Sequence, residues 1–418
     1  MAEIIPFQGL RYNIDKIGGW ELVTAPPYDV ISESERAVLQ ERSPYNITHL
    51  TLGKDVPGED KYERAATSLS NWIKDEILLP DGEDCIYIYE QEYLLDNGLR
   101  RKRRGFIALL GLERFGRGVI LPHEETLSAP REDRIRLLRA CRASLSPIFM
   151  LYYDPERTID SALITNKLVA TLENNRGESH RIWQLTSLGE MNRLKKAIMD
   201  KDVYLADGHH RYEAALIYQN ERAGEKAGNY IMAYLTNMAD DGLTILPVHR
   251  LIRLPHTDID KIEKEAGKFF TIKNAASLDR MLSLLTEGKE KHVIGSYSKH
   301  KGFSIFFLKD EEILNKLLRQ GRSTEWKMLD TNILHELLLN QTLEKEVEKD
   351  NITYTTSAEE AVTAVESGRF NVAFFLNPVR ASEVKSIAQR REKMPGKATY
   401  FYPKLLDGLV MWQESDRC

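Results

Sequence analysis

One short stretch, residues 203–215, constrains the fold and the chemistry of this chain more than any other. Val203 to Ala206 is apolar and leads into Asp207-Gly208, a pattern typical of a strand that ends in a tight turn. From His209 onward the apolar positions follow helical spacing, so we predict a helix there. The first amide groups of a helix have no partner within it and lie at the positive end of its dipole. The stretch therefore predicts an anion-binding site.

Three side chains of this junction suit a bound anion. Arg211 carries a permanently charged, planar guanidinium that matches phosphate or carboxylate. His209 and His210 can donate or accept protons near neutral pH. The alternative interpretation is an ordinary turn with Asp207 as a helix cap and no ligand. The concentration of Asp, Gly, two His and Arg at one junction favours the anion site.

The composition limits the class of protein. The chain has 418 residues, of which 42% are hydrophobic and 29% charged, as in soluble globular proteins of two or three domains. A net charge of −5 argues against a protein built for non-specific nucleic-acid binding. The chain has three cysteines without metal-like spacing, no apolar run of membrane length and no signal-peptide pattern. We therefore expect a cytoplasmic protein.

Predicted helices and strands alternate along the chain, which indicates an α/β protein with mixed (α+β) sheets. Residues 47–52 are expected to be extended and residues 158–174 helical. Lys and Glu become more frequent around residue 257. We therefore expect a core over residues 1–255 and an additional α/β lobe over residues 256–418.

Two local patterns add detail. Ser32 followed by Glu35 predicts a capping box at a helix start. Five consecutive basic residues, 100–104, follow a hairpin turn. They could contact phosphates, but we favour a solvated edge strand whose charges prevent pairing with another sheet.

Several further polar residues stand at strand ends or in rigid loops, where catalytic and binding groups are common in α/β proteins. Tyr28 and Asp29 follow Pro26-Pro27, which excludes a helix interior. The arginines of residues 131–142 either form a surface helix face or hold a polyphosphate, and both interpretations stay open. The candidates from these segments are Tyr28, Asp29, His123, Glu124, Arg134, Arg142, His249, Arg250, Lys397 and Lys404.

The familiar nucleotide and hydrolase motifs are missing from the sequence. It contains no Walker A loop, no Gly-x-Gly-x-x-Gly fingerprint after a strand, no Gly-x-Ser-x-Gly elbow and no His-Glu-x-x-His. A nucleotide, if bound, is held by a less common loop.

The long motifs of the chain resemble the domain of unknown function 1015 family almost from end to end. They are Ala25 to Ser32, Ser43 to Asn46, Leu121 to Glu124, Ser146 to Phe149, Ala206 to Glu213, Leu246 to Arg250 and Met394 to Lys404. The family's tail usually reads Met-Pro-Gln-Lys-Ser-Thr, whereas Gly396 and Ala398 stand here in place of the Gln and Ser. This departure weakens any catalytic role for those two positions.

The motif from Asp207 to Arg211 is also similar to the phosphate-binding signature of the ParB/sulfiredoxin-like superfamily, and closest to the Asp-Gly-His-x-Arg form of free-serine kinases. The resemblance implies a ParB/sulfiredoxin-like nucleotide-binding core and a link to serine metabolism. It further implies a kinase that transfers a phosphoryl group from ATP or ADP to a small hydroxy acid or amino acid, serine-like, with Mg²⁺ as cofactor.

In that interpretation the residues from Asp207 to Arg211 bind phosphate, and Glu124, Asp29 and His123 are, in that order, the candidates for the catalytic base. Asp207 and Glu124 could bind Mg²⁺ through their oxygens. The other candidates, Tyr28, Arg134, Arg142, His249, Arg250, Lys397 and Lys404, would contact the substrate.

Two other classes of function stay open. One is a nucleotide-binding regulatory protein of the chromosome-partition type, which the acidic charge and the lack of an obvious helix-turn-helix argue against. The other is a nucleotide-independent hydrolase or isomerase that uses His and Glu side chains. We expect a nucleotide and a small molecule as partners, no membrane and no nucleic acid; a homodimer stays open.

Overall fold

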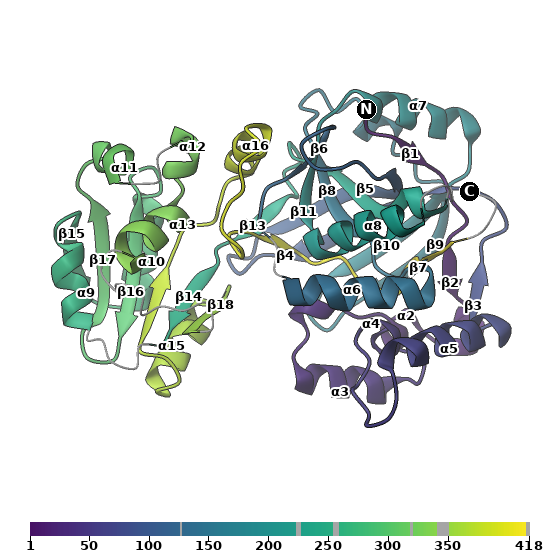
Figure 1. Cartoon of the computed structure of the whole chain (residues 1–418), viewed down its shortest axis with the longest axis horizontal. Helices are drawn as coiled ribbons and strands as arrows, with labels where there is room; N and C mark the ends of the chain where they lie inside the picture. The colour runs from purple at the N-terminus through teal and green to yellow at the C-terminus, as the bar shows by residue number, and fades with distance from the viewer. Residues whose placement is uncertain (126–127, 223–226, 254–258, 318–320, 341–350, 415–418) are drawn as a thin grey trace. The chain divides into compact units, whose positions relative to one another are not determined.

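A computed structural model describes the chain except for residues 126–127, 223–226, 254–258, 318–320, 341–350 and 415–418. Contacts between Cα atoms divide it into two compact units. Unit 1 comprises Met1–Pro122, Thr126–Thr244 and Pro403–Cys418, and unit 2 comprises His123–Glu125 and Ile245–Tyr402. Each unit has its own sheet (Figure 1). The two-domain division expected after residue 255 stays a prediction; the observed grouping differs from it chiefly in placing residues 403–418 with unit 1.

Unit 1 is built on a large mixed sheet. Its strands are β1 (Ile4–Ile5), β4 (Ile86–Leu94), β5 (Arg100–Gly111), β6 (Ile120–Pro122), β8 (Ile148–Tyr152), β9 (Lys167–Glu173), β10 (Ser179–Leu185), β11 (Val203–Asp207) and β12 (Tyr230–Asn237). They run in the order β6-β11-β8-β12-β5-β4-β10-β9, and β1 pairs with β5. β11 is parallel to β6 and antiparallel to β8, so the sheet mixes both directions.

Helices and short strands complete unit 1. They are β2 (Leu10–Tyr12), α1 (Ile14–Ile17), α2 (Trp20–Val23), η1 (Tyr28–Val30), α3 (Glu33–Arg42), α4 (Thr48–Thr51), α5 (Lys61–Lys74), β3 (Leu78–Pro80), α6 (Ser128–Cys141), β7 (Ala143–Ser144), η2 (Asp160–Ala162), α7 (Leu188–Met199), α8 (His209–Glu221), η3 (Ala227–Asn229) and β21 (Trp412–Gln413). Helices α6 and α8 pack against each other (Figure 1).

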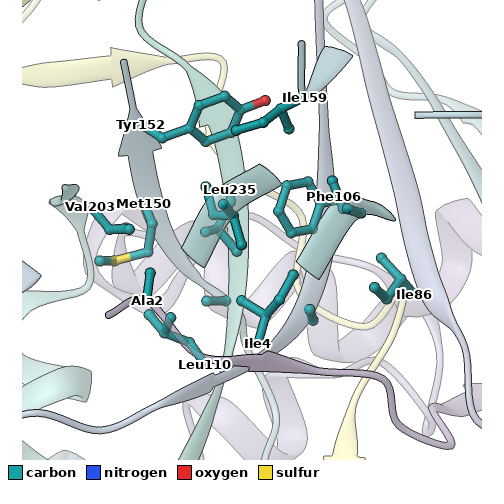
Figure 2. Packing of buried hydrophobic residues seen from close by; sticks show 14 of the residues in the cluster. Ala2, Ile4, Ile86, Phe106, Leu110, Met150, Tyr152, Ile159, Val203 and Leu235 are labelled. Carbon is teal, nitrogen blue, oxygen red and sulfur yellow. The ribbon is translucent and has the colours of Figure 1, made fainter. Parts of the chain in front are cut away.

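The core of unit 1 forms because side chains alternate between the two faces of each strand. In β5, Phe106, Ala108 and Leu110 point to one face because side chains alternate along a strand. They join Met150 of β8 and Leu235 of β12 in one buried cluster (Figure 2). This packing fixes the position of the part of the sheet in which β11 ends.

Unit 2 contains an antiparallel six-stranded sheet in the order β15-β17-β16-β19-β14-β18. Its elements are β13 (Thr244–Leu246, beginning at the unit boundary), β14 (His249–Ile252), α9 (Ile259–Ala266), β15 (Phe270–Ala275), α10 (Leu278–Glu287), β16 (Val293–Ser298), β17 (Gly302–Leu308), α11 (Glu312–Leu317), α12 (Thr324–Lys327), α13 (Asp330–Ile333), the π-helix η4 (Leu334–Leu339), β18 (Ile352–Thr355), α15 (Ala358–Glu366), β19 (Val372–Phe375), α16 (Ala381–Gln389) and β20 (Tyr400–Tyr402). Ile252 and Phe374 face one core, and Leu251 and Phe375 face the other, so both faces of the sheet are covered.

The structure confirms the expected α/β class with mixed sheets, whereas the ParB/sulfiredoxin-like assignment stays a prediction. The capping box is also confirmed, because Glu35 N–H donates to Ser32 Oγ at 3.2 Å and Ser32 N–H donates to Glu35 Oε2 at 2.8 Å. Within the described residues, none of the helices combines the length and the apolar character that crossing a membrane requires.

Three local expectations were wrong. Residues 47–52 contain helix α4 in place of an extended segment, because the Asn46 side chain accepts from the Thr48 amide at 3.1 Å and starts a helical turn. Residues 158–174 contain η2 and strand β9 in place of one helix, because β9 pairs with β10 along its length. The basic run belongs to β5, an interior strand of the sheet, and its Arg103 is fully buried.

Candidate functional site

The predicted strand, turn and helix at residues 203–215 are present in unit 1. Strand β11 ends at Asp207, and helix α8 begins at His209. Gly208 between them has φ 89° and ψ 27°, a left-handed conformation that suits glycine. Its amide donates to Asp207 Oδ1 at 2.7 Å. The start of α8 therefore has the geometry expected for an anion site.

Gly208 is required for a second reason, which gives a prediction. A Cβ at this position would lie 2.9 Å from Ile148 Cγ2 and 3.0 Å from the Arg211 guanidinium. We expect Gly208→Ala to cost about 2–4 kcal/mol, from the left-handed backbone and from overpacking together. Urea denaturation measures the loss.

Gly98 supplies the matched control for that substitution. It has φ 80°, but a Cβ there would meet nothing within 4 Å. Gly98→Ala should therefore cost only the backbone term, about 1–2 kcal/mol. Equal losses for the two variants would contradict the close packing of Gly208.

Three charged side chains surround the glycine turn. Arg211 Nη1 donates to the Pro147 carbonyl oxygen at 2.7 Å, and its Nε is buried without a hydrogen-bond partner among the described residues. Lys404 Nζ lies 2.7 Å from Asp207 Oδ2, with both side chains largely buried. Arg211 and the Lys404–Asp207 ion pair thus lie at the helix start, and their contact with phosphate or substrate stays a prediction.

The Pro-Pro segment brings an aromatic ring and a carboxylate to the same cluster. The Arg134 guanidinium lies 3.8 Å from the centre of the Tyr28 ring. Burial raises the pKa of Tyr28 to about 12, while Arg134 and Arg211 lower it and Asp29 and Asp207 raise it. All these charges therefore act on one phenol. Asp29 is exposed in the same 3-10 turn.

The C-terminal segment of unit 1 contributes a residue that the sequence analysis missed. Asp407 is 1% exposed, and its backbone pairs with Ala25 in both directions. Burial raises the pKa of its carboxyl group to about 7, whereas Arg211, Ser146 and Arg134 lower it. One sequence signal was present, since an Asp-Gly pair interrupts an apolar run there.

Two hollows border this cluster. A small cavity of about 60 Å³ has Arg134, Ser146 and Arg211 in a wall that is otherwise mostly apolar. A larger pocket of about 400 Å³ lies along Pro26, Val30 and other residues of that segment, within the size range of small-molecule sites.

Three further predicted residues of unit 1 lie at the ends of α6 and α8. Arg142 lies just beyond the end of α6 with its guanidinium Nε 3.7 Å from Glu414 Oε2. His209 is buried and His210 half-buried in the first turn of α8.

Five predicted residues belong to unit 2 and form a cluster of their own. His123 Nε2 lies 2.9 Å from Thr399 Oγ1, and Glu124 Oε1 accepts from the Lys397 amide at 2.8 Å. Arg250 is fully buried, and its Nη2 donates to the Lys397 carbonyl oxygen at 3.2 Å. The structure brings these three segments together within unit 2, and their role stays a prediction.

Burial sets the charge states of this second cluster. It lowers the pKa of His249 to about 4, with Arg250 adding to the effect, and it lowers the pKa of Arg250 to about 10. His249 Nδ1 accepts from the Leu376 amide at 3.4 Å, and its ring packs on Phe375. His249 is therefore a neutral, packed imidazole at physiological pH.

The two proposed Mg²⁺ ligands belong to different units, so a shared metal site stays a prediction. Asp207 belongs to unit 1 and is engaged by Lys404 and the Gly208 amide, while Glu124 belongs to unit 2. Across the part of the chain that the structure describes, no group of three or more His, Cys, Asp or Glu side chains could hold a metal ion.

Solved structures match the chain at low similarity. A conserved hypothetical protein from Pyrococcus furiosus has 14% identity, covers 69% of this chain and 90% of its own, and gives a TM-score of 0.36. Free serine kinase in complex with AMP has 11% identity over 68% of this chain and 83% of its own, with a TM-score of 0.36. SbnI from Staphylococcus aureus, with a C-terminal truncation, has 10% identity over 73% and 86%, with a TM-score of 0.36.

No curated protein matches the sequence. A family model described as a protein of unknown function (DUF1015) matches residues 4–332, well over half of the chain. The chain therefore belongs to the DUF1015 family.

Proposed function

We propose that unit 1 binds the phosphate groups of a nucleotide at the start of α8 and that the protein is a nucleotide-dependent phosphotransferase. One observation carries the proposal: the helix start after Gly208 lies among Arg211, Lys404 and Arg134. Backbone amides at a helix start and a guanidinium both favour phosphate oxygens. Tyr28 adds an aromatic face beside them.

The acceptor in this proposal is a small hydroxy acid or amino acid, and serine is the first to test because the Asp207 to Arg211 motif resembles that of free-serine kinases. Phosphoryl transfer depends mostly on positioning and charge stabilisation. A carboxylate must also take the hydroxyl proton. Asp29 is our candidate, since it is exposed and shares the electrostatic environment of Tyr28 with Arg134 and Arg211. Glu124 and His123 belong to unit 2, and their part in the reaction stays a prediction.

Mg²⁺ enters this proposal as the counter-ion of the nucleotide phosphates, because metal-bound phosphates are the usual form of ATP and ADP in kinases. The carboxylate of Asp207 is engaged by Lys404 and a backbone amide, so we derive no step through a metal held by the protein. The chemistry assigned to the chain itself is anion binding and proton acceptance.

A thermal-shift panel of ATP, ADP, CTP and AMP with Mg²⁺ tests the nucleotide site. One nucleotide at 100 times its dissociation constant should stabilise the wild type by about 2.7 kcal/mol. Arg211→Ala should weaken that nucleotide about 10- to 100-fold, because a charge-assisted hydrogen bond contributes roughly 1.5–3 kcal/mol. Serine and other hydroxy acids are then incubated with the binding nucleotide, and ³¹P NMR detects the phosphorylated product.

Arg139→Ala is the matched control, since it removes the same charge from an exposed ion pair between Arg139 of α6 and Glu221 of α8. It should bind the nucleotide like the wild type. If no nucleotide stabilises the wild type, or if Arg139→Ala loses as much affinity as Arg211→Ala, the site at Gly208 is not a nucleotide site. Binding without transfer to any acceptor would favour a regulatory nucleotide-binding protein.

A further inference from the structure

Asp407 is a buried carboxyl group whose oxygens have no hydrogen-bond partner of good geometry among the described residues. It is held in place from the backbone, because its amide donates to the Ala25 carbonyl oxygen at 2.8 Å and its own carbonyl oxygen accepts from the Ala25 amide at 3.3 Å. Buried polar groups normally have hydrogen-bond partners. Two buried carboxylate oxygens without a well-placed donor therefore point to a function.

Three charged side chains and one hydroxyl group act on the Asp407 carboxyl group, and they come from different elements of unit 1. Arg211 comes from α8, Arg134 from α6 and Asp29 from η1, and the Ser146 hydroxyl lies before β8. Burial is the largest influence and raises the pKa of the carboxyl group; the two arginines and Ser146 lower it, and Asp29 raises it. The carboxyl group is therefore balanced between its charged and neutral forms near neutral pH.

Arg211 has a buried donor nitrogen that lacks an acceptor among the described residues. Its Nη1 is used by the Pro147 carbonyl oxygen, while its Nε is buried without a described hydrogen-bond partner. Burying a guanidinium is costly unless a negative charge lies nearby. Of the carboxyl groups that act on this cluster, Asp407 is the one that is fully buried beside Arg211.

We propose that Asp407 is a positioning residue of the anion site, balancing the charge of Arg211 when the site is empty and taking up one proton when a phosphate group binds. This inference rests on the proposed function of unit 1. A bound phosphate would place a second negative group beside the same guanidinium, and a like charge favours the neutral form of a carboxyl group. The chemical step is a protonation, in which the carboxylate and one proton from solvent give the carboxylic acid.

Isothermal titration with ADP at pH 8, in two buffers of different ionisation enthalpy, measures the protons taken up on binding. ADP is fully ionised at this pH, so the wild type should show a net uptake approaching one proton. Asp407→Asn should bind ADP with that uptake removed. Asp240→Asn is the matched control, because Asp240 is another partly buried carboxyl group of unit 1 whose pKa burial raises, and it should behave like the wild type.

Difference infrared spectroscopy of the wild type gives a second readout that needs no folded variant and is insensitive to the histidines of α8. ADP binding should produce the C=O stretch of a protonated carboxyl group. Equal proton uptake in the wild type and Asp407→Asn, or no such band, would overturn the proposal for Asp407 while leaving nucleotide binding intact. If neither ADP nor inorganic pyrophosphate binds the wild type, the proposed function and this inference fall together.

Discussion

Arg103→Met is expected to destabilise unit 1 by about 3–5 kcal/mol, one of the two largest effects that the structure predicts. Arg103 is fully buried, with its guanidinium 4.7 Å from the Phe149 ring centre. Its Nη2 donates to the Pro403 carbonyl oxygen at 2.5 Å and also to the Gln91 side chain. The loss has two causes. The Pro403 carbonyl oxygen and the Gln91 side-chain oxygen are left without a hydrogen-bond donor, at about 1–3 kcal/mol each, and a buried cation–π contact is removed.

The same substitution should also weaken anion binding, although Arg103 is not part of the anion site. Pro403 precedes Lys404, and the Lys404 carbonyl oxygen accepts from Gln91 at 2.9 Å. Arg103 and Gln91 together therefore hold the segment that delivers Lys404 to Asp207. We expect a lower affinity for nucleotide together with the lower stability.

Urea denaturation and nucleotide titration measure the two effects. Arg100→Met is the matched control on the same strand, because Arg100 is exposed and forms a surface ion pair with Glu92. Such pairs contribute little, so this variant should stay within about 0.5 kcal/mol of the wild type. A loss below 1 kcal/mol for Arg103→Met would show that the buried guanidinium does not fix the C-terminal segment.

The basic run illustrates what the sequence does not determine. The hairpin turn before residue 100 and the apolar run at residues 105–112 predict a returning strand, but the choice between edge and interior depends on which segments pair with it. Residues 100–107 pair with β4 on one side of the strand, and residues 105–111 pair with β12 on the other. Phe149 and Tyr234, which face the Arg103 guanidinium, lie 46 and 131 positions further on in the sequence, and no local pattern links them.

The glycine turn is the opposite case. Its strand, its left-handed glycine and its helix start arise from adjacent residues, so the sequence predicts them well. For Lys404 the sequence left two interpretations open, a structural strap or a contact to an anion. The pairing of Lys404 with Asp207, however, depends on contacts across about two hundred positions.

Asp407 could not have been assigned from local sequence. Its Asp-Gly pair is typical of an exposed turn. The structure buries it, because its backbone pairs with Ala25 and its neighbours Leu406 and Leu409 are core residues. Only this burial turns an ordinary carboxylate into a group that can take up a proton from solvent near neutral pH.

The burial of Asp407 gives the second large prediction, a pH-dependent difference in stability between the wild type and Asp407→Asn. The pKa of Asp407 is about 7 in the folded chain, against about 3.9 for an unfolded aspartate. Between these values the folded state binds more protons than the unfolded state, so the wild type loses stability as the pH rises. Well below the unfolded pKa of about 3.9 both states are protonated, and the full contribution of the neutral group is present.

Asparagine does not titrate, so the variant lacks this dependence. The free energy of unfolding of Asp407→Asn minus that of the wild type should increase by about 4 kcal/mol from pH 4 to pH 8. Urea denaturation of both proteins at several pH values measures the difference, in which groups common to both chains cancel. A difference that stays constant with pH would mean that Asp407 keeps its charge throughout. Arg211 and Arg134 would then hold the carboxylate as a permanent ion, and anion binding would proceed without proton uptake.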